Sequence, residues 1–291
     1  MIELIKVAFV YGLVLGSLYL LISLGFTIVC GVLRVFHLGY GVIFIITVYV
    51  TYMLMETFHL HIVLAIIGML IIQIVFTLVV VYYPIVKRYI EQEELLLTAL
   101  VLVFLIVEQT ANFFYPVTAG VSIPTKIMGG ALIIGMAAIP YQLIFAAVVA
   151  IITTLILVLF LMKTKIGLII RSVSQDIESA ELMGADVWKI YALAMVISVL
   201  PPTLCMLVIA PVWAIEPSLG LPLMITAILV AILGGLGNIR GSIIASYILG
   251  FIASFTAFFI NTKLMSLSTL IIVLIVLIVR PQGIAKSETI W

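Results

Sequence analysis

The stretch from residue 7 to residue 28 reads VAFVYGLVLGSLYLLISLGFTI and contains no charged side chain. As a helix it would rise about 33 Å, which matches the roughly 30 Å hydrocarbon core of a bilayer. Comparable apolar stretches lie at residues 62–81, 141–162 and 243–260. A signal peptide is the competing interpretation of residues 7–28. The stretch is too long for a signal core and lacks a small-residue cleavage site, so we expect a retained helix.

The composition of the whole chain supports a membrane protein. Of 291 residues, 66% are hydrophobic and 9% are charged, and the mean hydropathy is +1.48. A soluble fold cannot cover that much apolar surface, so we expect membrane lipid around the chain. A net charge of +1 without a basic run disfavours nucleic-acid binding. Cys30 and Cys205 lie in apolar runs without metal-ligand spacing and predict no metal site.

Charges, prolines, glycines and polar clusters divide the chain into apolar segments. They lie near residues 5–31, 38–57, 61–86, 95–115, 140–162, 189–210, 222–235, 242–261 and 265–280. The segment at 222–235 is short and runs into glycines, so a half-helix or a re-entrant element is expected there. The sequence therefore predicts an all-α polytopic membrane protein with about eight to ten transmembrane helices, some broken or re-entrant. Residues 1–291 are expected to form one domain.

The lysines and arginines predict how the chain is oriented, because short cytoplasmic loops carry an excess of positive charge. With the N-terminus outside, the cytoplasmic residues are Arg34, Lys87, Arg88, Lys163, Lys165, Arg171, Lys189, Arg240, Arg280 and Lys286. Lys6, Lys126 and Lys263 are left outside. We therefore expect the N-terminus outside and the C-terminus inside the plasma (inner) cell membrane, provided that all nine segments cross.

Two connections are long enough to carry structure of their own. The outer one, Pro116–Pro140, is rich in glycine and proline and is expected to fold over the outer surface. The inner one, residues 163–189, carries four basic and four acidic residues, as expected of a docking surface for a soluble partner. A solvated loop with balanced charges is the alternative.

Capping residues predict a short helix within the inner connection. Asp176 is a suitable N-cap for a helix that begins near Ile177, and Gly184 is a suitable left-handed stop. Asp186 is a suitable cap for the helix that re-enters the membrane at Val187. The predicted short helix has about two turns and is nearly too short to persist without a partner.

The run TKIGLIIRSVSQDIESAELMG at residues 164–184 resembles the cytoplasmic loop of the branched-chain amino acid permease family of ATP-binding-cassette importers. The resemblance implies a coupling helix that sits in a groove of the cytosolic ATPase, with Glu178, Ala180 and Gly184 at the contact. Ala180 and Gly184, at i and i+4, are expected to form a face smooth enough for close approach. Ser179 replaces the family's first alanine, which is a small-for-small change.

The run ILGGLGNIRGS at residues 232–242 is similar to a glycine-rich signature of the same family. A phosphate loop is disfavoured, because no strand precedes the run and the Walker lysine is missing. A helix break fits better, and its freed backbone groups need protein or water, so such breaks line cavities. The path residues expected here are Gly234, Gly235, Gly237 and Asn238. Close helix packing without solute contact is the alternative.

A third match covers residues 12–49, with Gly12–Tyr19, Gly25–Gly31 and the run HLGYG at 37–41, and Arg280–Gly283 resembles the family's closing motif. His37 stands where the family has asparagine, and Tyr40 where it has histidine. The path residues expected here are His37, Gly39, Tyr40 and Gly41. We expect this element and the glycine-rich run to lie near each other around one central cavity. An interfacial His37 is the alternative.

Isolated polar residues at membrane depth are further candidates, because burying them in lipid is costly. Glu108 has Asn112 at i+4, within hydrogen-bond reach, and is a candidate partner for a substrate ammonium group. Gln73 and Thr77 share one face of the third segment. Pro201 and its neighbour Pro202, where the family more often has alanine and glycine, are expected to break or kink the sixth segment.

The resemblance implies a permease subunit of an ATP-binding-cassette importer for branched-chain or other amino acids. Its implied partners are cytosolic ATPase subunits, a second permease subunit, identical or homologous, and an extracytoplasmic solute-binding protein. The Walker motif is absent, so ATP is expected on the ATPase, and no catalytic, cofactor or metal residue is expected in this chain. The alternatives are a secondary (ion-coupled) transporter and an importer of urea, amides or sugars. An intramembrane enzyme ranks last, since no catalytic pair lies at membrane depth.

Overall fold

The computed structural model describes residues 2–115, 120–123, 128–134 and 137–285. Within these residues, eight helices are long and apolar enough to cross a membrane, and α2 is a shorter apolar helix. The predicted all-α polytopic fold is therefore confirmed. The helices are α1 (Ile2–Leu33), α2 (Gly41–Glu56), α3 (Ile62–Phe76), η1 (Thr77–Val86), α4 (Lys87–Tyr89), α5 (Glu93–Phe114), α6 (Tyr141–Lys163), α7 (Lys165–Gln175), α8 (Ile177–Leu182), α9 (Val187–Ile209), η2 (Pro217–Leu219), α10 (Gly220–Gly234), α11 (Ile239–Phe259), η3 (Thr262–Leu264) and α12 (Met265–Val279).

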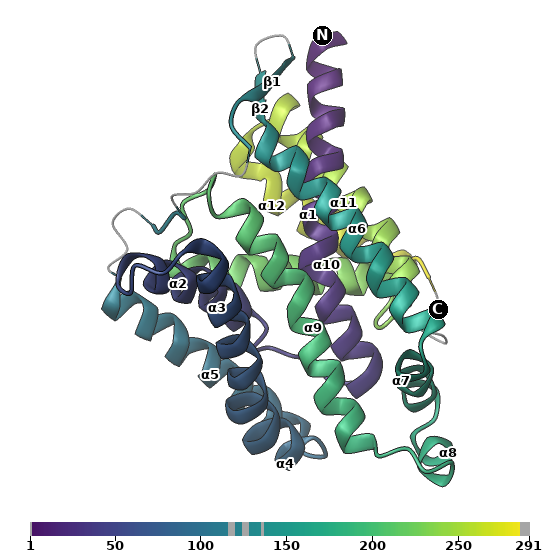
Figure 1. Cartoon of the computed structure of the whole chain (residues 1–291). Helices are drawn as coiled ribbons and strands as arrows, with labels where there is room; N and C mark the ends of the chain where they lie inside the picture. The colour runs from purple at the N-terminus through teal and green to yellow at the C-terminus, as the bar shows by residue number, and fades with distance from the viewer. Residues whose placement is uncertain (1, 116–119, 124–127, 135–136, 286–291) are drawn as a thin grey trace.

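The first apolar stretch forms the central helix of the bundle. In Figure 1, α1 (purple) runs between α9 and α6, and most of its residues are buried by other helices. Glycines allow α11 to approach it closely, since a Cβ atom added at Gly250 would lie 2.3 Å from the backbone nitrogen of Gly16. The hydroxyl groups of Thr27 and Ser242 are hydrogen-bonded at 2.9 Å across the same pair of helices. Small residues and interhelical hydrogen bonds are the usual means of helix association in lipid.

One end of the bundle carries most of the lysines and arginines, since Lys87 and Arg88 of α4 lie there with Lys163, Lys165, Arg171 and Lys189 beside α7 and α8. That this end faces the cytoplasm stays a prediction. In Figure 1, the N-terminal end of α1 and the hairpin of β1 (Ala131–Ile134) and β2 (Ala137–Pro140) lie at one end, and α4 and α8 lie at the other. Ser254 near the end of α11 donates to the carbonyl of Ala8, which places Lys6 and Lys263 at the hairpin end. Lys87 and Arg88 lie at the opposite end, on α4. The predicted positions of Lys126 and Lys286 lie outside the described residues.

The outer connection contains a hairpin that the sequence analysis did not predict. Strand β1 (Ala131–Ile134) pairs antiparallel with β2 (Ala137–Pro140). Val121 and Ile215 form a further β-bridge, which ties this connection to the loop after α9. Gln142 on α6 accepts from the N–H of Met128 in this connection and donates to the carbonyl of Val208 in the last turn of α9. The described part of the connection therefore covers the outer end of the bundle, as expected, whereas residues 116–119, 124–127 and 135–136 of it lie outside the described residues.

Two membrane helices depart from regular geometry. The third apolar segment continues from α3 into the π-helix η1, which contains Pro84. A π-helix is rare and is often found at functional sites. α9 continues as one helix through Pro201 and Pro202, so it is not broken there, although Pro202 has no N–H for the Ser198 carbonyl. The other expected outcome, a kink, stays a prediction.

Candidate functional site

The chain returns to the middle of the bundle after α1 ends. The Tyr40 hydroxyl donates to the carbonyl of Ile22 at 3.0 Å. Ile22 lies about 16 Å from the end of α1 at Leu33, given a rise of 1.5 Å per residue. Residues 34–40 therefore run back along α1, and α2 begins at membrane depth. Residues 38–57 were expected to form one crossing segment, but α2 has only 16 residues and begins at Gly41. It is entered from residues 34–40, an irregular stretch with a bend and a turn that is named the entry segment.

A compact junction of α1, α2 and α9 surrounds Tyr40, which is fully buried. A Cβ atom added at Gly25 would lie 1.8 Å from the carbonyl oxygen of Ser198 and 2.4 Å from the Tyr40 hydroxyl. Pro202 has no N–H to donate to the Ser198 carbonyl, so this oxygen is freed from the regular helical bonding of α9. The backbone of Gly25 occupies the space beside it. Gly25 is thus required for α9 and Tyr40 to reach α1.

The His37 side chain, in the entry segment at residues 34–40, is buried. Its exposed fraction is 5%, and its Nδ1 atom has no hydrogen-bond partner among the described residues. The ring is therefore enclosed by protein, and its place on the solute path stays a prediction. Gly39 separates the ring from α5, since a Cβ atom added there would lie 3.1 Å from the Leu100 carbonyl and 3.2 Å from His37 Cε1. A buried polar atom without a partner costs roughly 1–3 kcal/mol, so this position favours a bound polar group.

Gln73 on α3 is a second polar side chain at membrane depth. It is 1% exposed, and neither its Oε1 nor its Nε2 has a hydrogen-bond partner in the described part of the chain. Thr77, at the start of η1, is satisfied by donating to the Gln73 carbonyl at 2.8 Å. The two residues share a buried face, as predicted. Gln73 thus joins His37 as a buried group that is able to bind a polar solute.

Glu108 lies on α5, six residues before the outer end of that helix at Phe114, and its side chain is partly buried. The expected bond from Asn112 to Glu108 is not among the hydrogen bonds found within the described residues, and Asn112 Oδ1 is buried without a partner there. The carboxylate lies within roughly 9 Å of the outer end of α5, given the helical rise. Its predicted role with a substrate ammonium group stays a prediction.

The glycines between α10 and α11 have a packing or conformational reason. Gly235 and Gly237 have φ angles of +99° and +79°, a region that disfavours residues with a Cβ atom. A Cβ atom added at Gly237 would lie 2.6 Å from Gly31 Cα, and one at Gly234 would lie 2.5 Å from the backbone nitrogen of Ser242. The alternative of close packing therefore accounts for these glycines.

Asn238 has a capping role in the same turn. Its Oδ1 accepts from the backbone N–H of Gly241 at 2.9 Å and caps the start of α11. The closing segment covers this turn, since the Ile284 N–H donates to the carbonyl of Leu233 at 2.8 Å. Because Gly237 packs on Gly31, the turn lies beside the end of α1, where the entry segment begins. Their sharing of one cavity stays a prediction.

The inner connection has the predicted helix boundaries. Asp176 caps α8 by accepting from the Ser179 N–H at 3.2 Å, and Gly184 stops it with a φ angle of +87°. The Ser179 hydroxyl and N–H lower the pKa of the Asp176 carboxyl below its ordinary value. Asp186 caps α9 by accepting from the Lys189 N–H, also at 3.2 Å. Capping is local chemistry, which explains why these boundaries were predictable.

The faces of α8 differ from the prediction. Ala180 is 3% exposed and packs against its own chain, so it does not form an outward face with Gly184. Glu178 and Gly184 are exposed, as the predicted contact requires. The sequence analysis missed the apolar tip of this loop, where Leu182 and Met183 are 90% and 86% exposed. The sequence does contain a signal for this tip, because Leu182 and Met183 are an apolar pair that follows Glu181 in an otherwise charged connection.

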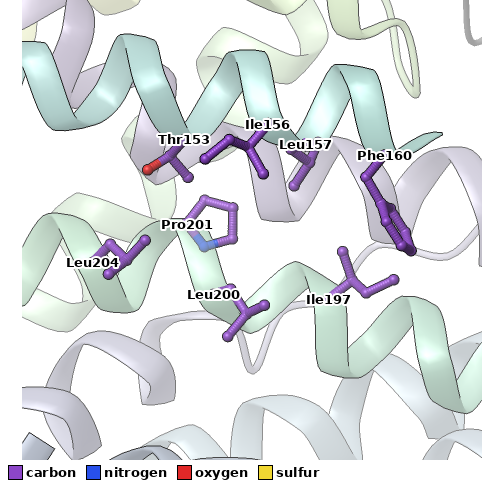
Figure 2. A pocket seen from close by; sticks show the side chains of 8 residues that line it. All are labelled: Thr153, Ile156, Leu157, Phe160, Ile197, Leu200, Pro201 and Leu204. Carbon is purple, nitrogen blue, oxygen red and sulfur yellow. The ribbon is translucent and has the colours of Figure 1, made fainter. Parts of the chain in front are cut away.

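An apolar cavity of about 300 Å³ lies between α6 and α9. Figure 2 shows the Pro201 ring facing the side chains of α6 across it. The side chains that line it are Thr153, Ile156, Leu157, Phe160, Ile197, Leu200, Pro201 and Leu204. One hydroxyl among apolar side chains does not suit the charged groups of a zwitterion, whereas it suits a lipid chain.

The helical bundle, the short helix α2 that begins at membrane depth and the buried polar groups are typical of a polytopic membrane transport protein. Residues 8–279 match the family described as "Branched-chain amino acid transport system / permease component". The chain therefore belongs to this family and is a permease subunit of an ATP-binding-cassette importer in the cell membrane. Such subunits associate with ATPase subunits and other transporter components.

Two relatives illustrate the similarity. The "High-affinity branched-chain amino acid transport system permease protein LivH" of Salmonella typhimurium is 25% identical, over 94% of this chain and 92% of that protein. The protein of the same name from Escherichia coli (strain K12) is 24% identical over the same shares. The solved structure "PsaBC from Streptococcus pneumoniae in complex with Fab" covers 98% of this chain and 93% of its own, at 14% identity and a TM-score of 0.49.

Proposed function

We propose that residues 1–291 form one transmembrane permease domain that carries branched-chain amino acids and couples their import to a separate cytosolic ATPase. The observation that supports this proposal is the family match over nearly the whole chain, with relatives named as branched-chain amino acid permeases. The chain itself catalyses no reaction and binds no cofactor. ATP is used by the partner.

The solute path passes the entry segment, residues 34–40, before α2. A branched-chain amino acid carries two charged groups and an apolar side chain, so its path needs a few hydrogen-bonding groups among apolar walls. His37 Nδ1 and the Gln73 amide are buried polar groups of this kind. Gly39 and Gly41 keep this segment close to its neighbours, and Tyr40 anchors it to α1. Glu108 meets the ammonium group nearer the outer end.

The turn between α10 and α11 forms the inner wall of this path. Gly234, Gly235 and Gly237 hold the turn against the end of α1, and Asn238 fixes the start of α11. The role of this turn is to position backbone. Outside the membrane, an extracytoplasmic solute-binding protein delivers the solute, and a second permease subunit completes the path.

Transport by the complete complex tests the solute class. The complex is purified from native membranes and reconstituted in vesicles, and ATP-dependent uptake of radiolabelled leucine is measured. We expect isoleucine and valine to compete with leucine, and urea and a hexose to have no effect. Uptake that requires an ion gradient in place of ATP, or that urea blocks, would contradict the proposal.

The ATPase contact is the apolar tip of α8. Leu182 and Met183 insert into the ATPase, with Glu178 and Gly184 beside them and Ala180 supporting α8 from within. Buried apolar anchors dominate protein interfaces, so replacing both tip residues by serine is expected to weaken ATPase binding by about tenfold or more. Serine at Leu168, an exposed leucine of α7, is the matched control. Full recovery of the ATPase with the double variant would rule out this contact.

A further inference from the structure

Arg34 has an unusual backbone conformation at a decisive place in the chain. Its φ angle is +57°, in the left-handed region that a residue with a long side chain rarely adopts. It is the first residue after α1 and begins the entry segment, which leads to His37 and Tyr40. Such a conformation persists where contacts hold it, and it often marks a switching element.

The contact that holds Arg34 comes from the inner connection. Its guanidinium Nη2 donates to the carbonyls of Ser174 and Gln175 at 3.0 and 3.1 Å. These are the last two residues of α7, where helix carbonyls lack internal partners and the helix dipole is negative. The guanidinium also attracts the carboxylate of Asp176, which caps α8. The Arg34 side chain therefore joins the start of the entry segment to the start of α8.

The bundle does not depend on this contact for its fold. Ile170 and Val173 of α7 are buried in the same apolar cluster as Val32 and Leu33 of α1, so the two helices also pack without Arg34. The Arg34 side chain is exposed, and exposed charged contacts form and break at small cost. A contact of this kind is suited to a conformational change.

We propose that Arg34 is a positioning residue that transmits movement of α8 to the segment at residues 34–41. This inference rests on the proposed docking of an ATPase at α8. When the ATPase displaces α8, the end of α7 moves, and the hydrogen bonds that hold Arg34 in the left-handed conformation change. The backbone change passes into the entry segment, whose far end is anchored at Tyr40. ATP binding thereby alters the surroundings of His37.

Two variants separate this role from a merely structural one. Arg34→Gly removes the guanidinium and tolerates the positive φ angle, so the fold is retained. Arg34→Lys keeps the charge but loses the planar fork, so an intermediate effect is expected. Arg88→Ala is the matched control, because Arg88 is an exposed arginine at the same end of the bundle, on α4.

Hydrogen–deuterium exchange of the complete reconstituted complex measures the transmission. Peptides covering residues 34–41 and 177–184 are followed with and without a non-hydrolysable ATP analogue, and leucine uptake per ATP hydrolysed is measured in parallel. In the wild type, the analogue is expected to change exchange in both peptides. In Arg34→Gly, the change at 177–184 persists, while the change at 34–41 and the uptake per ATP fall at least about fivefold. Arg88→Ala behaves as the wild type.

The role of Arg34 and the docking of an ATPase at α8 are contradicted by different results. An undiminished response at 34–41 in Arg34→Gly, with normal uptake per ATP, would overturn the role of Arg34 alone. An absence of any response at 177–184 in the wild type would overturn the ATPase docking and the role of Arg34 with it.

Discussion

The segment at residues 34–41 and the turn at residues 234–241 both interrupt the membrane helices, and glycines allow close backbone approach in both. In the turn, the glycines are explained by packing or by a positive φ angle, and Asn238 caps α11. In the segment, His37 Nδ1 is buried without a partner among the described residues. Glycines in a membrane protein thus indicate where backbones meet. A buried polar atom that lacks a partner is the better indicator of a solute path.

The largest expected effect comes from crowding the turn. In Gly241→Val, the new Cβ atom would lie 1.9 Å from the carbonyl oxygen of Gly234, so α10 and α11 must separate. Overpacking of this kind is expected to cost about 3 kcal/mol or more of unfolding free energy. Thermal unfolding of the purified protein measures it. Gly129→Val is the control, because no atom lies within 4 Å of a Cβ atom there. Equal stability of the two variants would contradict the packing explanation of the turn.

A smaller effect on stability is expected at the anchor of the segment. Tyr40→Phe keeps the ring but removes the hydrogen bond to Ile22, at a cost of about 1 kcal/mol. Tyr49→Phe is the matched control, because Tyr49 lies in the middle of α2 and its hydroxyl donates to the Ile215 carbonyl at 2.9 Å. Similar losses of stability are expected for both variants. Leucine uptake should fall in Tyr40→Phe alone, and equal uptake in the two would separate Tyr40 from the path.

The smallest effect on stability is expected at His37, although transport should change. His37→Asn removes a buried imidazole nitrogen that has no hydrogen-bond partner among the described residues, but it also leaves a smaller side chain in the same space. Because these two effects oppose each other, the unfolding free energy is expected to change by less than about 1 kcal/mol. The KM for leucine uptake should shift several-fold, since the polar group on the path changes. His61→Asn, at the exposed N-cap of α3, keeps a capping side chain and should leave the KM unchanged. A KM in His37→Asn equal to that of the wild type would contradict the role of the segment at residues 34–41 as the part that contacts the solute.

The inner connection shows how far local chemistry reaches. The caps at Asp176 and Asp186 and the stop at Gly184 were predictable, because each acts on residues at most a few positions away. The orientation of α8 was not predictable from those caps. Ala180 faces inward because α7 and α9 pack on that side, and the same packing leaves Leu182 exposed.

The sequence by itself determined that the chain crosses a bilayer many times. Apolar length is a property of each stretch alone, and no tertiary contact is needed to see that the 22 residues from Val7 to Ile28 match the membrane. Cationic residues likewise predicted the two ends of the bundle before any contact was known, because their cost in lipid keeps them at the surface.

Tertiary structure alone decided where α2 begins and what surrounds His37. The depth of a helix start depends on whether neighbouring backbones leave room for the chain that enters it. That room exists because Gly25 lies against the Ser198 carbonyl and Gly39 lies against Leu100, contacts between residues far apart in the sequence. Whether a buried nitrogen finds a partner depends on the same distant contacts, which no local pattern specifies.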